Sequence, residues 1–135
     1  MSTTRGLRNN NPGNIRVSKT KWQGEVEEST KKDSAFEEFK DMAHGYRALL
    51  KLLQNYRKVH NLQTITEIIS RWAPPIENNT AGYISRVCKE MGVEEGYVPN
   101  INDKEVMCSL AAAISQVENG VPAVILDIEA GWNLL

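Results

Sequence analysis

Glu118 is the carboxylate that this sequence places best for acid–base chemistry. Residues 106–120 read V-M-C-S-L-A-A-A-I-S-Q-V-E-N-G, where apolar residues recur at steps of three and four and predict a helix with one buried face. Gly120 ends this helix, because glycine tolerates a left-handed conformation. Partial burial and the negative end of the helix dipole both favour the protonated form of a carboxyl group there. Glu118 is therefore a candidate general acid; the alternative is a solvent-exposed side chain at a frayed helix end.

Amide and aromatic side chains elsewhere are suited to binding a sugar chain. Residues 5–16 read R-G-L-R-N-N-N-P-G-N-I-R and predict an ordered loop. An asparagine amide both donates and accepts hydrogen bonds, as recognition of sugar hydroxyls and N-acetyl groups requires. The candidate substrate-binding residues are Asn10, Asn11, Asn14, Trp22, Asn78, Asn79 and Tyr83. Tyr83 also lies at the helical spacing of a core residue, so the sequence leaves both roles open.

A second carboxylate is needed if the reaction is an inverting hydrolysis, since one group then activates water across the cleft. Glu25, Glu27 and Asp33 are the candidates, and we favour Glu25 as the second catalytic residue. One glutamate suffices if the N-acetyl group of the substrate takes part, or if an anhydro sugar is released.

Other kinds of active site find no support in the sequence. No serine lies in a G-x-S-x-G motif, neither cysteine has a paired histidine, and no glycine-rich phosphate loop occurs. His44 and His60 have no Cys or His neighbours at ligand spacing, so we expect no metal site and no cofactor. Cys88 and Cys108 lie in apolar helical patterns and are expected to be reduced core residues.

The elements that must position these residues are predicted to be mostly helical. A chain of 135 residues predicts a single domain over 1–135. Alternating apolar and charged residues predict a small antiparallel β-hairpin region over 15–39. The expected fold class is therefore α+β, mainly helical. Helical periodicity and capping signals predict helices over 41–58, 64–72, 81–91, from the caps Asn102-Asp103 to Gly120, and over 123–130.

The charge distribution limits the choice of partner. A net charge of −1 with 24% charged residues excludes a generally basic nucleic-acid binder. Residues 1–24 nevertheless carry five basic residues and no acidic one. This segment is either a short solvated arm or an attraction for an anionic partner, such as nucleic acid or a cell-wall polymer. No signal peptide and no apolar run of membrane-spanning length is visible.

Four short motifs carry a family resemblance. In order, N-N-N-P-G-N-I-R, W-Q-G, F-E-E-F and H-G-Y-R-A-L-L-K-L-L resemble the body of flagellar-type N-acetylglucosaminidases of the lysozyme-like superfamily. The residues that match are Asn10, Asn11, Gly13, Ile15 and Arg16 in the loop, Trp22 and Gly24 in the second motif, and Tyr83 in a later helix. In that family the catalytic glutamate, in E-S-x-x-G, ends a helix that precedes the loop. Here A-A-A-I-S-Q-V-E-N-G follows the loop, and Asn119 replaces the serine. The resemblance therefore implies a circularly permuted lysozyme-like domain with Glu118 as its acid.

The chain, with its segment I-S-R-W-A-P-P-I-E-N-N-T, also resembles small phage and prophage proteins described as virion structural proteins. Two functions follow: a peptidoglycan-cleaving glycosidase or lytic transglycosylase, or a non-catalytic virion structural or wall-binding protein. Nucleic-acid binding is the least favoured, because aromatic and basic residues are not interleaved. The expected partners are peptidoglycan or a related N-acetylated glycan, and other virion proteins. We expect synthesis in the cytoplasm, followed by virion association or release to the cell wall.

Overall fold

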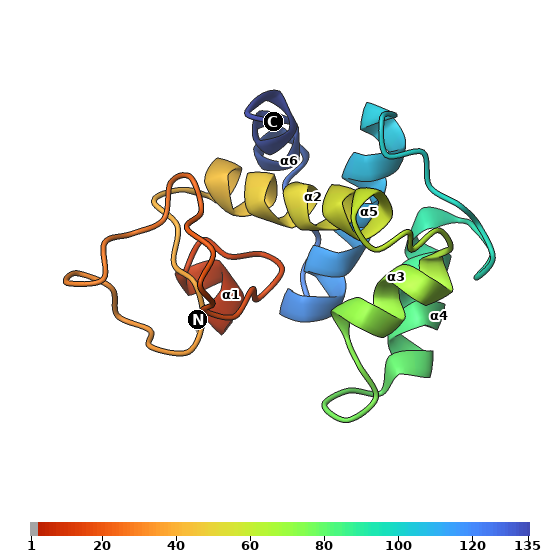
Figure 1. Cartoon of the computed structure of the whole chain (residues 1–135), viewed down its shortest axis with the longest axis horizontal. Coiled ribbons are helices and arrows are strands. Elements are labelled where there is room, and N and C mark those ends of the chain that lie inside the picture. Colours follow the sequence, from red (N-terminus) through yellow and green to blue (C-terminus); the bar gives the residue numbers. More distant parts are fainter. Residues whose placement is uncertain (1–2) are drawn as a thin grey trace.

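The computed structural model describes residues 3–135 and contains six helices within them (Figure 1). They are α1 (Arg5–Arg8), α2 (Met42–Lys58), α3 (Ile65–Trp72), α4 (Thr80–Met91), α5 (Lys104–Asn119) and α6 (Ile125–Asn133). Within this part of the chain, none of the helices combines the length and the apolar composition that crossing a membrane requires.

The helix ends follow local capping chemistry. The predicted capping box of α3 is confirmed: Oγ1 of Thr64 accepts a hydrogen bond from the backbone N–H of Glu67 at 3.1 Å, and Oε1 of Glu67 accepts one from the N–H of Thr64 at 3.0 Å. Gly92 and Gly120 end α4 and α5 with φ of 70° and 71°. Helix α6 begins later than predicted, at Ile125, and its N-cap Val124 makes no side-chain capping hydrogen bond.

The predicted α+β class and the β-hairpin region over 15–39 are wrong. In place of a sheet, the structure has two isolated antiparallel bridges, Arg16 with Phe36 and Glu25 with Phe39. The residues between these bridges are mostly polar and exposed, so two paired strands would have little apolar surface to bury. The segment is instead held as loops, with Ile15 and Phe39 buried against α2.

Helix α2 is the centre of the molecule (Figure 1). Its residues Leu49, Leu50 and Leu53 are completely or almost completely buried in a core to which α3, α4, α5 and α6 contribute. Helix α6 crosses α2 closely: a Cβ on Gly131 would lie 2.7 Å from the Cβ of Tyr46. The N-terminal loops lie at one end of α2, and α3 and α4 lie at the other.

Candidate active site

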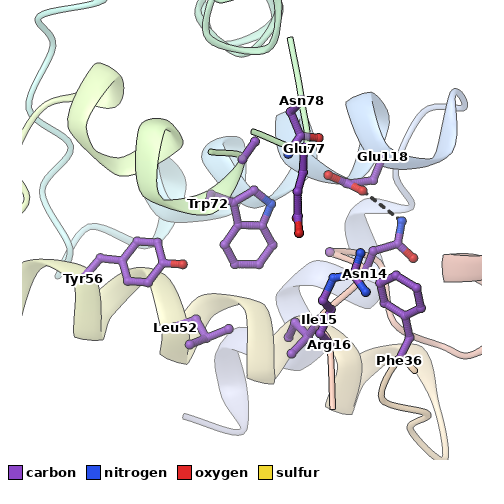
Figure 2. A pocket seen from close by; sticks show the side chains of 12 residues that line it. Asn14, Ile15, Arg16, Phe36, Leu52, Tyr56, Trp72, Glu77, Asn78 and Glu118 are labelled. Carbon is purple, nitrogen blue, oxygen red and sulfur yellow. Dashed lines mark hydrogen bonds between the residues drawn. The ribbon is translucent and has the colours of Figure 1, made fainter. Parts of the chain in front are cut away.

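Glu118 lies in the last turn of α5 and is held by residues from two distant parts of the chain. Its Oε1 accepts a hydrogen bond from Nδ2 of Asn14 at 2.9 Å (Figure 2). Its Oε2 accepts one from the hydroxyl of Tyr83 on α4 at 2.7 Å. The structure thus brings the carboxylate of α5 and the asparagine-rich loop to one place, although Asn14 and Glu118 are 104 residues apart.

A crevice of about 370 Å³ opens beside this carboxylate. Its volume falls in the range of ligand-binding pockets. Aromatic side chains of the loops, α2 and α3 form part of its wall, and aliphatic residues, amides and charged groups form the remainder (Figure 2). The lining residues are Gly13, Asn14, Ile15, Arg16, Phe36, Leu52, Tyr56, Trp72, Ala73, Glu77, Asn78 and Glu118. The crevice therefore combines apolar surface with amide and charged groups.

The asparagines of the loop have separate tasks. Asn11 is buried, and its side chain binds the backbone of Ile15 at both N–H and C=O and the C=O of Glu37. Asn10 donates to the C=O of Phe39 at 3.1 Å and adopts a φ of 51°. These two residues shape the loop. Asn14, also at a φ of 51°, is the asparagine of the predicted set that reaches Glu118.

Asn119 ties the loop to the end of α5. Its Nδ2 donates to the backbone oxygen of Pro12 at 3.0 Å, and its Oδ1 accepts from the hydroxyl of Thr4 at 2.6 Å. Gly6 lies against the same side chain, where a Cβ would come within 2.6 Å of Oδ1 of Asn119. The residue that departs from the glucosaminidase motif therefore positions the loop beside Glu118.

Tyr83 is 7% exposed, so its ring belongs to the core and its hydroxyl to the site. Burial, and next the negative charge of Glu118, raise the pKa of Tyr83 well above its usual range. The hydroxyl therefore keeps its proton and donates it in the hydrogen bond to Glu118. Tyr83 is thus a core residue whose hydroxyl contacts Glu118, and it is not among the residues that line the crevice.

The other predicted binding residues lie in different surroundings. Asn78 lines the crevice, and its side chain donates to the C=O of Pro74 at 3.3 Å. Asn79 caps α4 by accepting from the N–H of Gly82 at 3.1 Å. Trp22 packs in the small cluster around Ile15 and does not line the crevice.

The predicted second carboxylates lie outside the crevice. Glu25 accepts a hydrogen bond from the N–H of Trp22 at 3.2 Å, and its carboxyl group lies near the buried Glu37, whose pKa it raises. Asp33 accepts two hydrogen bonds from Arg5, at 2.6 and 2.7 Å. Arg5, and next Asn9, hold the pKa of the Asp33 carboxyl well below its usual range. Glu27 is exposed on a surface loop.

Neither a metal cluster nor a disulfide is found in the part of the chain that the structure describes. Between residues 3 and 135, no group of three or more His, Cys, Asp or Glu side chains is arranged to hold a metal ion. Cys88 and Cys108 are both free thiols.

A relative from a phage decides the family of this chain. The chain is 37% identical over 131 residues to protein P5 of Pseudoalteromonas phage PM2, and the match covers 95% of this chain and 79% of that protein. The chain belongs to the P5 family. No model of a known protein family matches it. The expected relationship to phage proteins is thus confirmed, whereas the comparison does not show membership of the lysozyme-like superfamily.

The crevice of this P5-family protein carries charges of both signs. Glu77 lines it together with Glu118, from the turn between α3 and α4. Arg16 contributes an exposed guanidinium group, which stacks 4.7 Å from the ring centroid of Phe36. Arg5 lies over the same ring at 4.3 Å. These contacts fix a cation at the edge of a crevice that contains two carboxylates.

Sequence reasoning missed Glu77 as a site residue. The composition of Glu77-Asn78-Asn79-Thr80 predicts a polar turn that caps the next helix, and the capping by Asn79 agrees with this. The available signal was that Glu77 directly precedes the candidate binding residues Asn78 and Asn79. Trp72, Tyr56 and Phe36 were equally compatible with core positions.

Proposed function

We propose that this P5-family protein is a phage peptidoglycan-cleaving glycosidase or lytic transglycosylase, with Glu118 as its general acid. The observation that carries this proposal is the position of Glu118 at a crevice, held by the neutral donors Asn14 and Tyr83. Each oxygen of a carboxyl group that accepts one hydrogen bond from a neutral donor still has a second lone pair, which can bind a proton. It can deliver that proton to the oxygen of a glycosidic bond as the bond to the anomeric carbon breaks.

The remaining crevice residues support a glycan substrate. Trp72, Tyr56 and Phe36 offer apolar faces to sugar rings. The amides of Asn14 and Asn78 lie in the same crevice and are suited to the hydroxyl and N-acetyl groups of a peptidoglycan strand. The cationic Arg16 would favour a glycan that carries carboxylates.

The meeting of loop and helix also supports a single lysozyme-like domain over 1–135 in permuted order. In such an arrangement the helix that ends with the acid must reach the asparagine loop although it follows the loop in the chain. The contacts of Asn14 with Glu118 and of Pro12 with Asn119 have this geometry.

The experiment is a turbidity or zymogram assay on purified peptidoglycan, with analysis of the released sugars. Glu118→Gln should lower the rate by about 100-fold or more, the range for loss of a general acid, and its melting temperature shows whether the variant still folds. Glu105→Gln is the matched control, because Glu105 is an exposed glutamate in the first turn of the same helix. An inactive wild-type protein, or equal rates for wild type and Glu118→Gln, would refute the proposal.

A second candidate is a non-catalytic virion structural or wall-binding protein. It is favoured by an apolar surface at the start of α6, where Val124, Ile125 and Leu126 are 57%, 70% and 76% exposed. Contiguous exposed apolar residues are typical of contacts between proteins. Incorporation into purified virions that is lost in Ile125→Ser, or co-sedimentation with cell walls without release of sugar, would support this candidate.

A further inference from the structure

Glu77 and Glu118 enter one crevice from different elements. Glu118 ends α5, whereas Glu77 lies in the turn between α3 and α4. Figure 2 shows the side chain of Glu77 extending into the crevice alongside the indole of Trp72, with Glu118 and Asn14 beyond it. A sugar chain in this crevice would therefore lie within reach of two carboxyl groups.

Hydrogen bonds hold the turn that carries Glu77. The N–H of Glu77 donates to the C=O of Pro74 at 3.1 Å, and Nδ2 of Asn78 donates to the same oxygen at 3.3 Å. The hydroxyl of Thr80, at the start of α4, donates to the C=O of Ala73 at the end of α3. Proline at 74 and 75 further restricts the backbone. The position of the Glu77 backbone is thus set by both neighbouring helices.

The two carboxylates differ in their hydrogen bonds. Both oxygens of Glu118 accept one from another side chain. The carboxylate of Glu77 is exposed and has neither a hydrogen bond nor an ion pair with any residue in the described range 3–135. An exposed carboxylate without a cationic partner is available to take a proton from water, whereas Glu118 is fixed at one point of the wall.

We propose that Glu77 is the second catalytic carboxylate of this crevice and acts as the general base of an inverting hydrolysis. This inference rests on the proposed function. Glu77 removes a proton from a water molecule while the water oxygen forms a bond to the anomeric carbon. The bond from that carbon to the glycosidic oxygen breaks, and its electron pair stays on the oxygen, which takes the proton of Glu118. One glycosidic bond and one water become two sugar ends, and solvent restores both carboxyl groups.

The first measurement is the anomeric configuration of the sugar released by the wild type from purified peptidoglycan strands, followed by NMR at early times. General-base catalysis by Glu77 predicts inversion. Retention of configuration, or an anhydro product, would overturn the role of Glu77 and leave that of Glu118 standing.

The second measurement is rescue by azide, an anion that attacks carbon without needing a base. Glu77→Ala should lower the rate by about 100-fold or more, and sodium azide should restore it with formation of a glycosyl azide of inverted configuration. Glu90→Ala, which removes an exposed glutamate of α4, should cleave like the wild type and form no azide product. Melting temperatures of both variants control for folding.

The outcomes separate the two proposals. If the wild type is inactive on peptidoglycan, the proposed function fails. If the wild type is active, Glu118→Gln is not, and Glu77→Ala cleaves at the wild-type rate or gives no azide adduct, only the role of Glu77 is refuted.

Discussion

The burial of Glu37 is expected to make the stability of this protein fall as pH rises toward neutrality. Its side chain is 1% exposed, and Oε1 lies 4.0 Å from Nζ of Lys31. Burial, and next the neighbouring carboxyl group of Glu25, raise the pKa of Glu37 to about 7, while Lys31 acts in the opposite direction. Burial and a nearby like charge both disfavour the ionised form of a carboxyl group. The folded protein therefore holds a proton near neutral pH that an exposed glutamate would have released.

The sign and size of the effect follow from this difference. Between the usual pKa of 4.5 and about 7, the folded state binds a proton at Glu37 that the unfolded state has lost. The free energy of unfolding should therefore fall as pH rises through this window, by up to about 1.4 kcal/mol per pH unit. Over the whole window the loss amounts to at most about 3.4 kcal/mol, a substantial part of the stability of a domain.

The assay is urea unfolding between pH 4.5 and 8 of the wild type and of Glu37→Gln, whose amide is neutral throughout. The variant should match the wild type most closely near pH 4.5 and become relatively more stable as pH rises. Glu27→Gln, at an exposed loop position, should keep the wild-type dependence. Parallel curves for the wild type and Glu37→Gln would show that Glu37 is ionised in the folded state, and the reasoning from burial would be wrong.

Three further substitutions test how the crevice is built. Gly13→Ala would place a Cβ 2.8 Å from Cζ2 of Trp72, so it should lower the free energy of unfolding in urea by about 1–3 kcal/mol and weaken cell-wall binding. Wild-type values for both would contradict the close contact. Tyr83→Phe leaves Glu118 without one donor; we expect about 1 kcal/mol of lost stability and slower peptidoglycan cleavage, so a rate equal to the wild type would deny that donor a role. Arg16→Gln removes the crevice cation, so binding to peptidoglycan at low salt should weaken by up to about 10-fold, while binding to neutral chitin oligosaccharides stays constant. Equal losses of affinity for both ligands would exclude recognition of substrate carboxylates by Arg16.

The helices could be predicted because their signals are local. The periodicity of residues 41–58 and the capping box of Thr64 and Glu67 depend on neighbours within two turns, and both agree with α2 and α3. The hairpin could not be separated from an extended loop, since both expose alternate residues. Ile15 and Phe39 do turn inward, yet they pack on α2 instead of pairing along strands.

The site was predictable only in part, because its geometry depends on contacts between distant segments. The sequence indicated that Glu118 lies at a helix end and that the asparagines form an ordered loop. It could not show that the side-chain amide of Asn11 donates to backbone carbonyl groups, whereas that of Asn14 donates to Glu118. The sequence also could not show which second acidic residue shares a crevice with Glu118. We favoured Glu25 from the sequence, whereas the structure has Glu77 in the crevice.

The hydrogen bond between Asn14 and Glu118 has a consequence for the time at which the crevice appears. At usual rates of translation, about 5–20 residues per second, the ribosome makes Glu118 roughly 5–20 s after the asparagine that binds it. Closing a loop of this length costs about 4 kcal/mol of chain entropy, which the docking of α5 on the core must offset. A nascent chain that has not yet released α5 lacks both the acid of the crevice and the residues that α5 contributes to the core. The complete crevice therefore forms in the host cell only after α5 has been synthesised and has docked.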